Sequence, residues 1–98
     1  MYLGHFTFEV EPDKQEDFLK AVRERIRPHW MAGGRCWDYS VYQEWDAAHG
    51  KPGNRFIKNQ VMEGMPGKKE RSREDQEVID LFYSFAKNVS ITVYVKKV

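Results

Sequence analysis

The sequence predicts one α+β domain, residues 1–98, with the element order βαββαβ. Four segments alternate apolar and polar residues with a period of two, which is typical of strands with one buried face. Two other segments repeat apolar residues at helical spacing, with charged residues on the opposite side. The 98-residue length fits a single domain with a thin core.

The first predicted strand covers residues 2–10. One of its faces carries Phe6, Phe8 and Val10, and the other face carries His5 with Leu3, Thr7 and Glu9. The following helix can begin in two ways. Either Asp13 and Glu16 form a capping box, or Glu11 caps a helix whose first position is Pro12.

The first predicted helix is amphipathic and ends near a proline. Its apolar stripe consists of Phe18, Leu19, Val22 and Ile26. Pro28 disfavours helical geometry at Arg27, so we expect the helix to stop or kink there. Gly33 and Gly34 then complete the break.

Residues 36–45 and 55–63 predict the second and third strands, and residues 46–54 predict a hairpin loop between them. Strict alternation assigns two sets of side chains to opposite faces of the second strand. One set is Trp37, Tyr39, Val41, Gln43 and Trp45, and the other is Cys36, Asp38, Ser40, Tyr42 and Glu44.

The second predicted helix follows a break at residues 64–67 and a polar run at residues 68–73. Ser72 is the expected N-cap, and Asn88 suits the helix end. Residues 90–98 predict the last strand. The helical stripe consists of Val78, Ile79, Phe82, Phe85, Ala86 and Val89.

These elements together predict a ferredoxin-like sandwich, in which two helices cover one face of a four-stranded antiparallel sheet. The second and third strands carry apolar residues on both faces. A small monomer does not leave such a surface in water, so a second subunit, a ligand or both should cover the open face. We therefore predict a homodimer.

Composition excludes several classes of function. Sixteen Lys and Arg residues balance fifteen Asp and Glu residues, which argues against a nucleic-acid partner. No apolar stretch is long enough to span a membrane, and no signal peptide is evident. The single cysteine, Cys36, indicates a reducing compartment, so we expect a cytoplasmic protein. His5, His29 and His49 lack metal-ligand spacing, and we expect neither a metal nor another cofactor.

Several local features resemble those of the dimeric α+β barrel superfamily, especially domains similar to antibiotic-biosynthesis monooxygenases. These features are the segment 6–12 leading into a helix, the Gly33-Gly34 turn, the segment 39–43, and Arg55-Phe56 at the third strand. The resemblance implies two ferredoxin-like sheets that pair face to face as a dimeric α+β barrel and enclose a pocket in each subunit. Residues 64–75 contain no histidine where family members often carry one, so the family's oxygenase residues do not carry over one by one.

The candidate site residues are those that could face a pocket on the open side of the sheet. His5 could act as a base near neutral pH, or could be a strand histidine without a role. Trp37 and Tyr39, or alternatively Tyr42, could line an aromatic pocket, or simply pack in the core or dimer. Asn59 or Gln60, whichever faces the pocket, could orient a carbonyl or hydroxyl group.

Other polar and aromatic residues have simpler interpretations. His29 and Trp30 could border the same cavity or seal the end of the first helix. Asp38, Arg55 and Lys58 could form ion pairs across strands.

Two functions remain open from the sequence. The first is a small-molecule enzyme, a cofactor-independent oxygenase or isomerase that acts on a hydrophobic or aromatic ligand between the sheet and the partner subunit. The alternative is a non-catalytic ligand-binding or structural dimer module.

Overall fold

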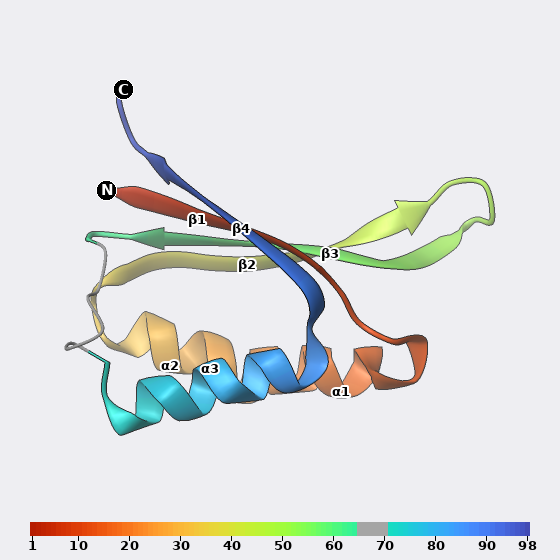
Figure 1. The fold of residues 1–98 in the computed structure, drawn as a ribbon, viewed down its shortest axis with the longest axis horizontal. Coiled ribbons are helices and arrows are strands. Elements are labelled where there is room, and N and C mark those ends of the chain that lie inside the picture. Colours follow the sequence, from red (N-terminus) through yellow and green to blue (C-terminus); the bar gives the residue numbers. More distant parts are fainter. Residues whose placement is uncertain (65–70) are drawn as a thin grey trace.

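The computed structural model, which describes residues 1–64 and 71–98, confirms the predicted fold class. Four antiparallel strands form one sheet in the order β2-β3-β1-β4 (Figure 1). The predicted break and polar run fall partly on residues 65–70, which lie outside the described residues. The strands are β1 (Tyr2–Glu9), β2 (Cys36–Asp46), β3 (Lys51–Met62) and β4 (Lys87–Val95).

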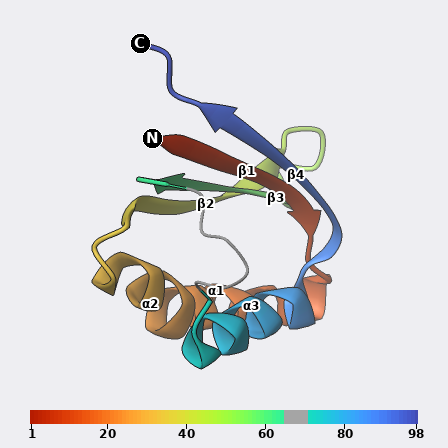
Figure 2. The ribbon, with the colours of Figure 1, turned by 60° about the vertical axis from the view of Figure 1, so that its left-hand side comes forward.

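All helical segments lie on one side of the sheet, and the described residues leave its other side bare (Figure 2). The second helix is α3 (Arg73–Phe85), which runs beside the first helical region. That first region is a continuous series of short pieces: the 3₁₀ turn η1 (Pro12–Lys14), α1 (Gln15–Ala21), the π-helical turn η2 (Val22–Ile26) and α2 (Arg27–Ala32).

The first helical region continues past Pro28, where we expected a stop or a kink. The wider π turn precedes the proline, and the Arg27 amide donates to the Val22 carbonyl, five residues back. Proline in a regular helix lacks an N–H and collides with the carbonyl four residues earlier. The π turn changes the position of that carbonyl, so the chain passes the proline and remains helical until Ala32.

The two helix starts differ in their caps. Pro12 takes the first position of η1 after Glu11, which is one of the two predicted starts, and no side chain caps it. At α3, Ser72 is the N-cap as predicted. Its hydroxyl accepts from the Asp75 amide at 3.0 Å, and the Asp75 carboxylate accepts from the Ser72 amide at 3.1 Å. This reciprocal capping box fixes both the start of α3 and the Asp75 side chain.

Strand β2 departs from strict alternation at its beginning. Cys36 pairs with Met62 while Asp38 pairs with Val61, so one extra residue, Trp37, forms a β-bulge. The bulge places Cys36 and Tyr39 in the core together, although alternation had assigned them to opposite faces. Trp37 itself is 60% exposed.

Two element boundaries also differ from expectation. The hairpin loop is shorter, because β3 already pairs with β2 at Lys51 and Pro52. Helix α3 ends at Phe85, and Asn88 adopts a left-handed φ of 53° at the start of β4 instead of ending the helix. Asparagine is among the few residues that tolerate this conformation.

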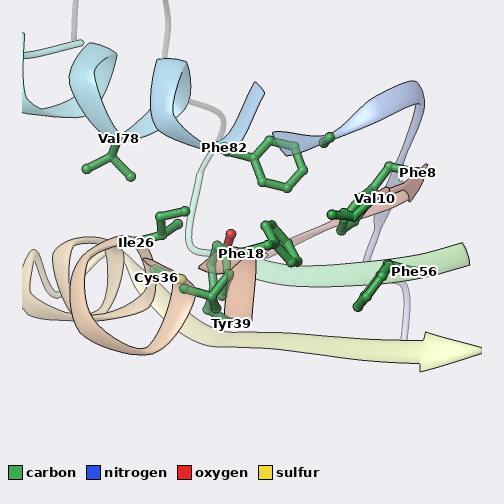
Figure 3. Packing of buried hydrophobic residues seen from close by; sticks show 11 residues of the cluster. Phe8, Val10, Phe18, Ile26, Cys36, Tyr39, Phe56, Val78 and Phe82 are labelled. Carbon is green, nitrogen blue, oxygen red and sulfur yellow. The ribbon is translucent and has the colours of Figure 1, made fainter. Parts of the chain in front are cut away.

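The core fills the space between the sheet and the helices, and phenylalanine rings dominate it (Figure 3). Phe8 of β1 lies edge-on to Phe18 of α1 and to Phe82 of α3, with centroid distances of 5.6 Å and 5.0 Å. It also stacks on Phe56 of β3 at 5.7 Å. The helical stripes and the β1 face therefore meet as predicted. None of the described helices is long and apolar enough to cross a membrane.

Candidate active site between the sheet and the helices

A cavity of about 370 Å³ lies between the sheet and the helices, within the size range of small-molecule sites. Its floor comes from the helix-facing sides of all four strands, and α2 and α3 cover it. The wall is mostly apolar. Its residues are Tyr2, Gly4, Phe6, Ile26, Trp30, Arg35, Cys36, Tyr39, Lys58, Gln60, Met62, Arg71, Asp75, Val78, Ile79, Phe82, Tyr83, Ile91 and Val93.

Lys58 of β3 is the unusual member of this wall, because it is only 5% exposed. Its Nζ lies 3.5 Å from the centroid of the Phe6 ring and 4.7 Å from that of Phe82. Among the described residues no carboxylate pairs with it, and its hydrogen bond goes to Gln60 Oε1 at 3.3 Å. Burial lowers the pKa of Lys58 from 10.5 to about 7, against a smaller opposing effect of Cys36.

Tyr39 supplies a second polar group to the same wall. Its ring is almost completely buried, and Figure 3 shows the side chain rising from β2 toward the helices. The hydroxyl has no hydrogen-bond partner among the described residues. Burial raises the pKa of Tyr39, so the phenol stays protonated and can donate. On the backbone side, Arg27 Nε donates to the Tyr39 carbonyl at 2.9 Å and ties β2 to α2.

Gln60 and Cys36 are two further polar members of the wall. The Gln60 amide nitrogen donates to Met62 Sδ at 3.4 Å, while its oxygen faces Lys58. Cys36 Sγ donates to the Asp38 carbonyl at 3.2 Å. Burial raises the pKa of the Cys36 thiol, so it stays neutral and is a poor nucleophile. Of the thiol and the amine, the Lys58 amine is therefore the better nucleophile at neutral pH.

A contact between a histidine and a carboxylate on two helices borders the cavity. His29 Nε2 lies 2.7 Å from Asp75 Oδ1, which joins α2 to the first turn of α3. Partial burial acts to raise the pKa of Asp75, but the bonds from His29 and Ser72 outweigh it and the net pKa is lowered. Trp30, next to His29, lines the cavity. His29 contacts the wall residue Asp75, so both residues lie at this helix-side cavity, whereas the cavity that we expected them to border was on the open face.

The structure divides the predicted site residues between two faces of the sheet. Tyr39 and Gln60 line the helix-side cavity. His5 and Asn59 lie opposite each other on the open face, where His5 Nδ1 is 2.7 Å from Asn59 Oδ1. Tyr42 is 57% exposed and, like Trp37, is not part of the cavity wall. The cavity with Lys58 therefore lies on the helix side of the sheet. A second pocket, lined in part by Thr7, Tyr42 and Ile57, lies on the open face, where the predicted site stays a prediction.

The sequence reasoning missed Lys58, which we had assigned to an ion pair across strands. That assignment is wrong, because Lys58 is buried and forms no ion pair within the described chain. Asp38 instead accepts from the Ser40 hydroxyl at 2.8 Å, whereas Arg55 does form an ion pair across strands, with its Nε 4.0 Å from Glu9 Oε1. The sequence did contain an indication of this burial. Lys58 is an even number of residues from Phe56 and Met62, so its side chain points to the same, helix-facing side of β3.

The part of the chain that the structure describes holds no group of three or more potential metal ligands. The polar groups around Lys58 are an amine, a phenol, an amide and a thiol, and the wall also carries the guanidinium groups of Arg35 and Arg71 and the carboxylate of Asp75. Such a set suits hydrogen bonding, proton transfer and nucleophilic attack on a small organic molecule.

Comparison with known proteins gives structural neighbours only. No protein-family model and no curated protein matches the sequence. Solved structures match over nearly the full chain. A protein from Nitrosomonas europaea, assigned to the antibiotic biosynthesis monooxygenases, aligns with a TM-score of 0.69 at 16% identity, covering 98% of both chains.

Two further structures agree with this match. An antibiotic biosynthesis monooxygenase aligns with a TM-score of 0.68 at 10% identity, covering 99% of both chains. A conserved protein from Methanosarcina mazei Go1 aligns with a TM-score of 0.68 at 23% identity, covering 98% of this chain and 92% of its own. At these identities the shared property is the fold.

Proposed function

We propose, starting from the fold shared with antibiotic-biosynthesis-monooxygenase-like proteins, that this chain is a small-molecule enzyme. Its substrate would be a hydrophobic or aromatic compound held between the sheet and the helices. The observation that carries the proposal is that one apolar cavity contains both buried Lys58 and the Tyr39 hydroxyl, which has no hydrogen-bond partner among the described residues. A domain that needed only a packed core would fill this space with hydrocarbon.

The chemistry we propose begins with proton transfer. With a pKa of about 7, a large share of the Lys58 side chains carries a free amine at neutral pH, where a general base works best. The Tyr39 hydroxyl and the Gln60 amide would hold a carbonyl or hydroxyl group of the substrate. Removal of a proton from an activated C–H or O–H group is a first step open to both an isomerase and a cofactor-independent oxygenase.

We also propose that the domain forms a homodimer through the open face of the sheet. Tyr42 and Tyr94 are more than half exposed there in the monomer. His5 and Asn59 lie among them, so their functional role stays a prediction that depends on this interface. Light scattering after size exclusion should give twice the monomer mass at micromolar concentration, and Tyr94→Arg should lower it. A wild-type monomer would contradict the dimer.

The unpaired, buried Cys36 fits the cytoplasmic location that we propose.

Ligand binding can be tested with 2-naphthol and the fluorescence of Trp30. Because Trp37 and Trp45 are exposed and outside the cavity wall, a Trp37→Phe/Trp45→Phe variant leaves Trp30 as the sole tryptophan reporter. We expect saturable quenching of Trp30 by 2-naphthol. Ile79→Phe, which fills the cavity, should weaken binding at least about tenfold, a loss of about 1.4 kcal/mol.

The matched control is Ile57→Phe, the same change on the open face of β3. It should leave the affinity for 2-naphthol unchanged. Equal effects of the two substitutions would place the ligand elsewhere and refute the assignment of the cavity. Turnover is then tested by oxygen uptake and by proton exchange of bound naphthols, because an enzyme of the proposed kind must accelerate one of them over buffer.

A further inference from the structure

We propose that Lys58 is a covalent site at which a hydrophobic aldehyde or ketone forms an imine inside the cavity. This inference rests on the proposed function, since it uses the same cavity, and it adds the substrate class and a bond to the protein. It does not follow from the fold, because imine formation needs a free amine in a suitable place. Three features of the Lys58 environment support imine formation, and the reaction itself needs no other reagent.

The first feature is that the surroundings fit an amine better than an ammonium ion. An ammonium group has three donors, yet among the described residues only Gln60 Oε1 accepts from it. Its other neighbours are the ring faces of Phe6, Tyr39 and Phe82, at 3.5, 5.1 and 4.7 Å from Nζ to the centroids. Ring faces attract a cation but replace only part of its hydration.

The second feature is the resulting reactivity. A lysine whose pKa lies near its ordinary 10.5 carries a free amine in roughly one molecule in a few thousand at pH 7. At a pKa of about 7, half of the Lys58 side chains carry the lone pair that attacks a carbonyl carbon. Desolvation in an apolar pocket is an established way to activate a lysine for imine formation.

The third feature is a donor for the carbonyl oxygen. The Tyr39 hydroxyl lines the same cavity, stays protonated and has no partner among the described residues. A buried donor without an acceptor costs free energy, and a carbonyl oxygen placed there would remove that cost. Tyr39 would thus polarise the carbonyl while the Lys58 amine approaches its carbon.

Imine formation itself needs neither an oxidant nor a reductant. The Lys58 nitrogen bonds to the carbonyl carbon, the π electrons move to oxygen, and a proton passes from nitrogen to oxygen to give a carbinolamine. Loss of this hydroxyl with one further proton as water leaves the carbon–nitrogen double bond. The net reaction converts a carbonyl compound and an amine into an imine and water.

The apolar residues of the wall favour a substrate whose carbonyl group carries a hydrophobic chain or ring. Ile79 and Val78 of α3 and Ile91 of β4 face the space beyond Lys58, so a chain or ring attached to the carbonyl would bury hydrocarbon. The other titratable or charged residues of the wall, which share the electrostatic environment of Lys58, are Tyr2, Arg35, Cys36, Tyr39, Arg71, Asp75 and Tyr83. Among these residues, the Cys36 thiol stays neutral because burial raises its pKa, and the Asp75 carboxylate is engaged by His29 and by the Ser72 amide.

The experiment uses 2-naphthaldehyde and sodium cyanoborohydride, which reduces an imine to a stable secondary amine. Intact mass and peptide mapping then locate the adduct, whose added mass equals that of the aldehyde less one oxygen. At pH 7 and limiting aldehyde, we expect Lys58 to react about tenfold or more faster than any surface lysine. The rate should fall as the pH is lowered from 7 to 5, because the amine becomes protonated.

Two variants control the result. Lys58→Met should lose the fast adduct, with folding checked by circular dichroism, and Lys20→Met, on the exposed side of α1, should retain it. Adducts spread over surface lysines at equal rates in the wild type would overturn the proposal, whether or not Lys58→Met folds. If 2-naphthol still quenches Trp30 in that case, the cavity function stands and only the covalent step fails. If 2-naphthol does not bind either, both proposals fail.

Discussion

Replacing Lys58 by methionine should stabilise the protein at neutral pH and below. Methionine has a similar length and carries no charge, so the substitution keeps the packing against Phe6 and Phe82 and removes the buried amine. The free energy of unfolding should therefore increase, in contrast to most substitutions at a position only 5% exposed.

The magnitude follows from the difference between the folded and unfolded pKa values. The pKa of Lys58 is about 7 in the folded chain and near 10.5 when unfolded. At about 1.4 kcal/mol per pH unit, protonated Lys58 lowers the free energy of unfolding by about 5 kcal/mol. Between these two values the unfolded chain binds more protons than the folded chain, so wild-type stability rises with pH. The penalty is complete below pH 7 and disappears above about pH 10.5.

Urea denaturation at pH 6 and pH 9 provides the measurement. Other groups titrate equally in both proteins, so they cancel when the wild type is subtracted from Lys58→Met. The stability advantage of the variant should shrink by about 2–3 kcal/mol between pH 6 and pH 9. Lys20→Met, at an exposed position, should show a difference near zero at both pH values. A pH-independent difference for Lys58→Met would refute the claim that Lys58 is buried as an amine.

Two further substitutions test the cavity wall and the start of α3. Tyr39→Phe removes a buried hydroxyl that has no partner in the described part of the chain, so it should stabilise the fold by about 1 kcal/mol while weakening 2-naphthol binding. A clear loss of stability would mean that the hydroxyl is satisfied in solution. Ser72→Ala removes the N-cap and should cost about 1 kcal/mol in urea denaturation. Ser90→Ala, at an exposed position of β4, should cost less than about 0.5 kcal/mol, and an equal loss at both serines would contradict the role of the capping box.

The strands and helices were predictable because their signals are local and redundant. Phe6 and Phe8 mark one face of β1 by alternation, and the stripes that include Ile26 and Phe82 mark the buried sides of the helices. Ser72 indicated the start of α3 because serine is a favoured N-cap residue. Each of these patterns repeats within a few residues, so one exception does not change the outcome.

The site was only partly predictable, because its position depends on details that alternation does not record. A one-residue bulge at Trp37 moved Cys36 to the same face as Tyr39, and no residue near it announces a bulge. The exposed aromatic residues led us to predict a pocket on the open face, whereas the cavity that Lys58 lines lies under the helices. Tyr39 and Gln60 were identified as candidates. Lys58 was interpreted from its charge alone, and its position on the helix-facing side of β3 was not considered.

The π turn before Pro28 means that the first helical region contains one residue more than its geometry requires. A π turn absorbs an extra residue, so the segments on both sides keep their orientation. Deletion of one residue within Val22–Ile26 would preserve the directions of Phe18 and Trp30 but return Pro28 to a regular helix, at a cost of about 3 kcal/mol. The same deletion in α3 would rotate everything beyond it by about 100°. A deletion in the first helical region therefore lowers stability but keeps the helical segments that cover the cavity in their orientation.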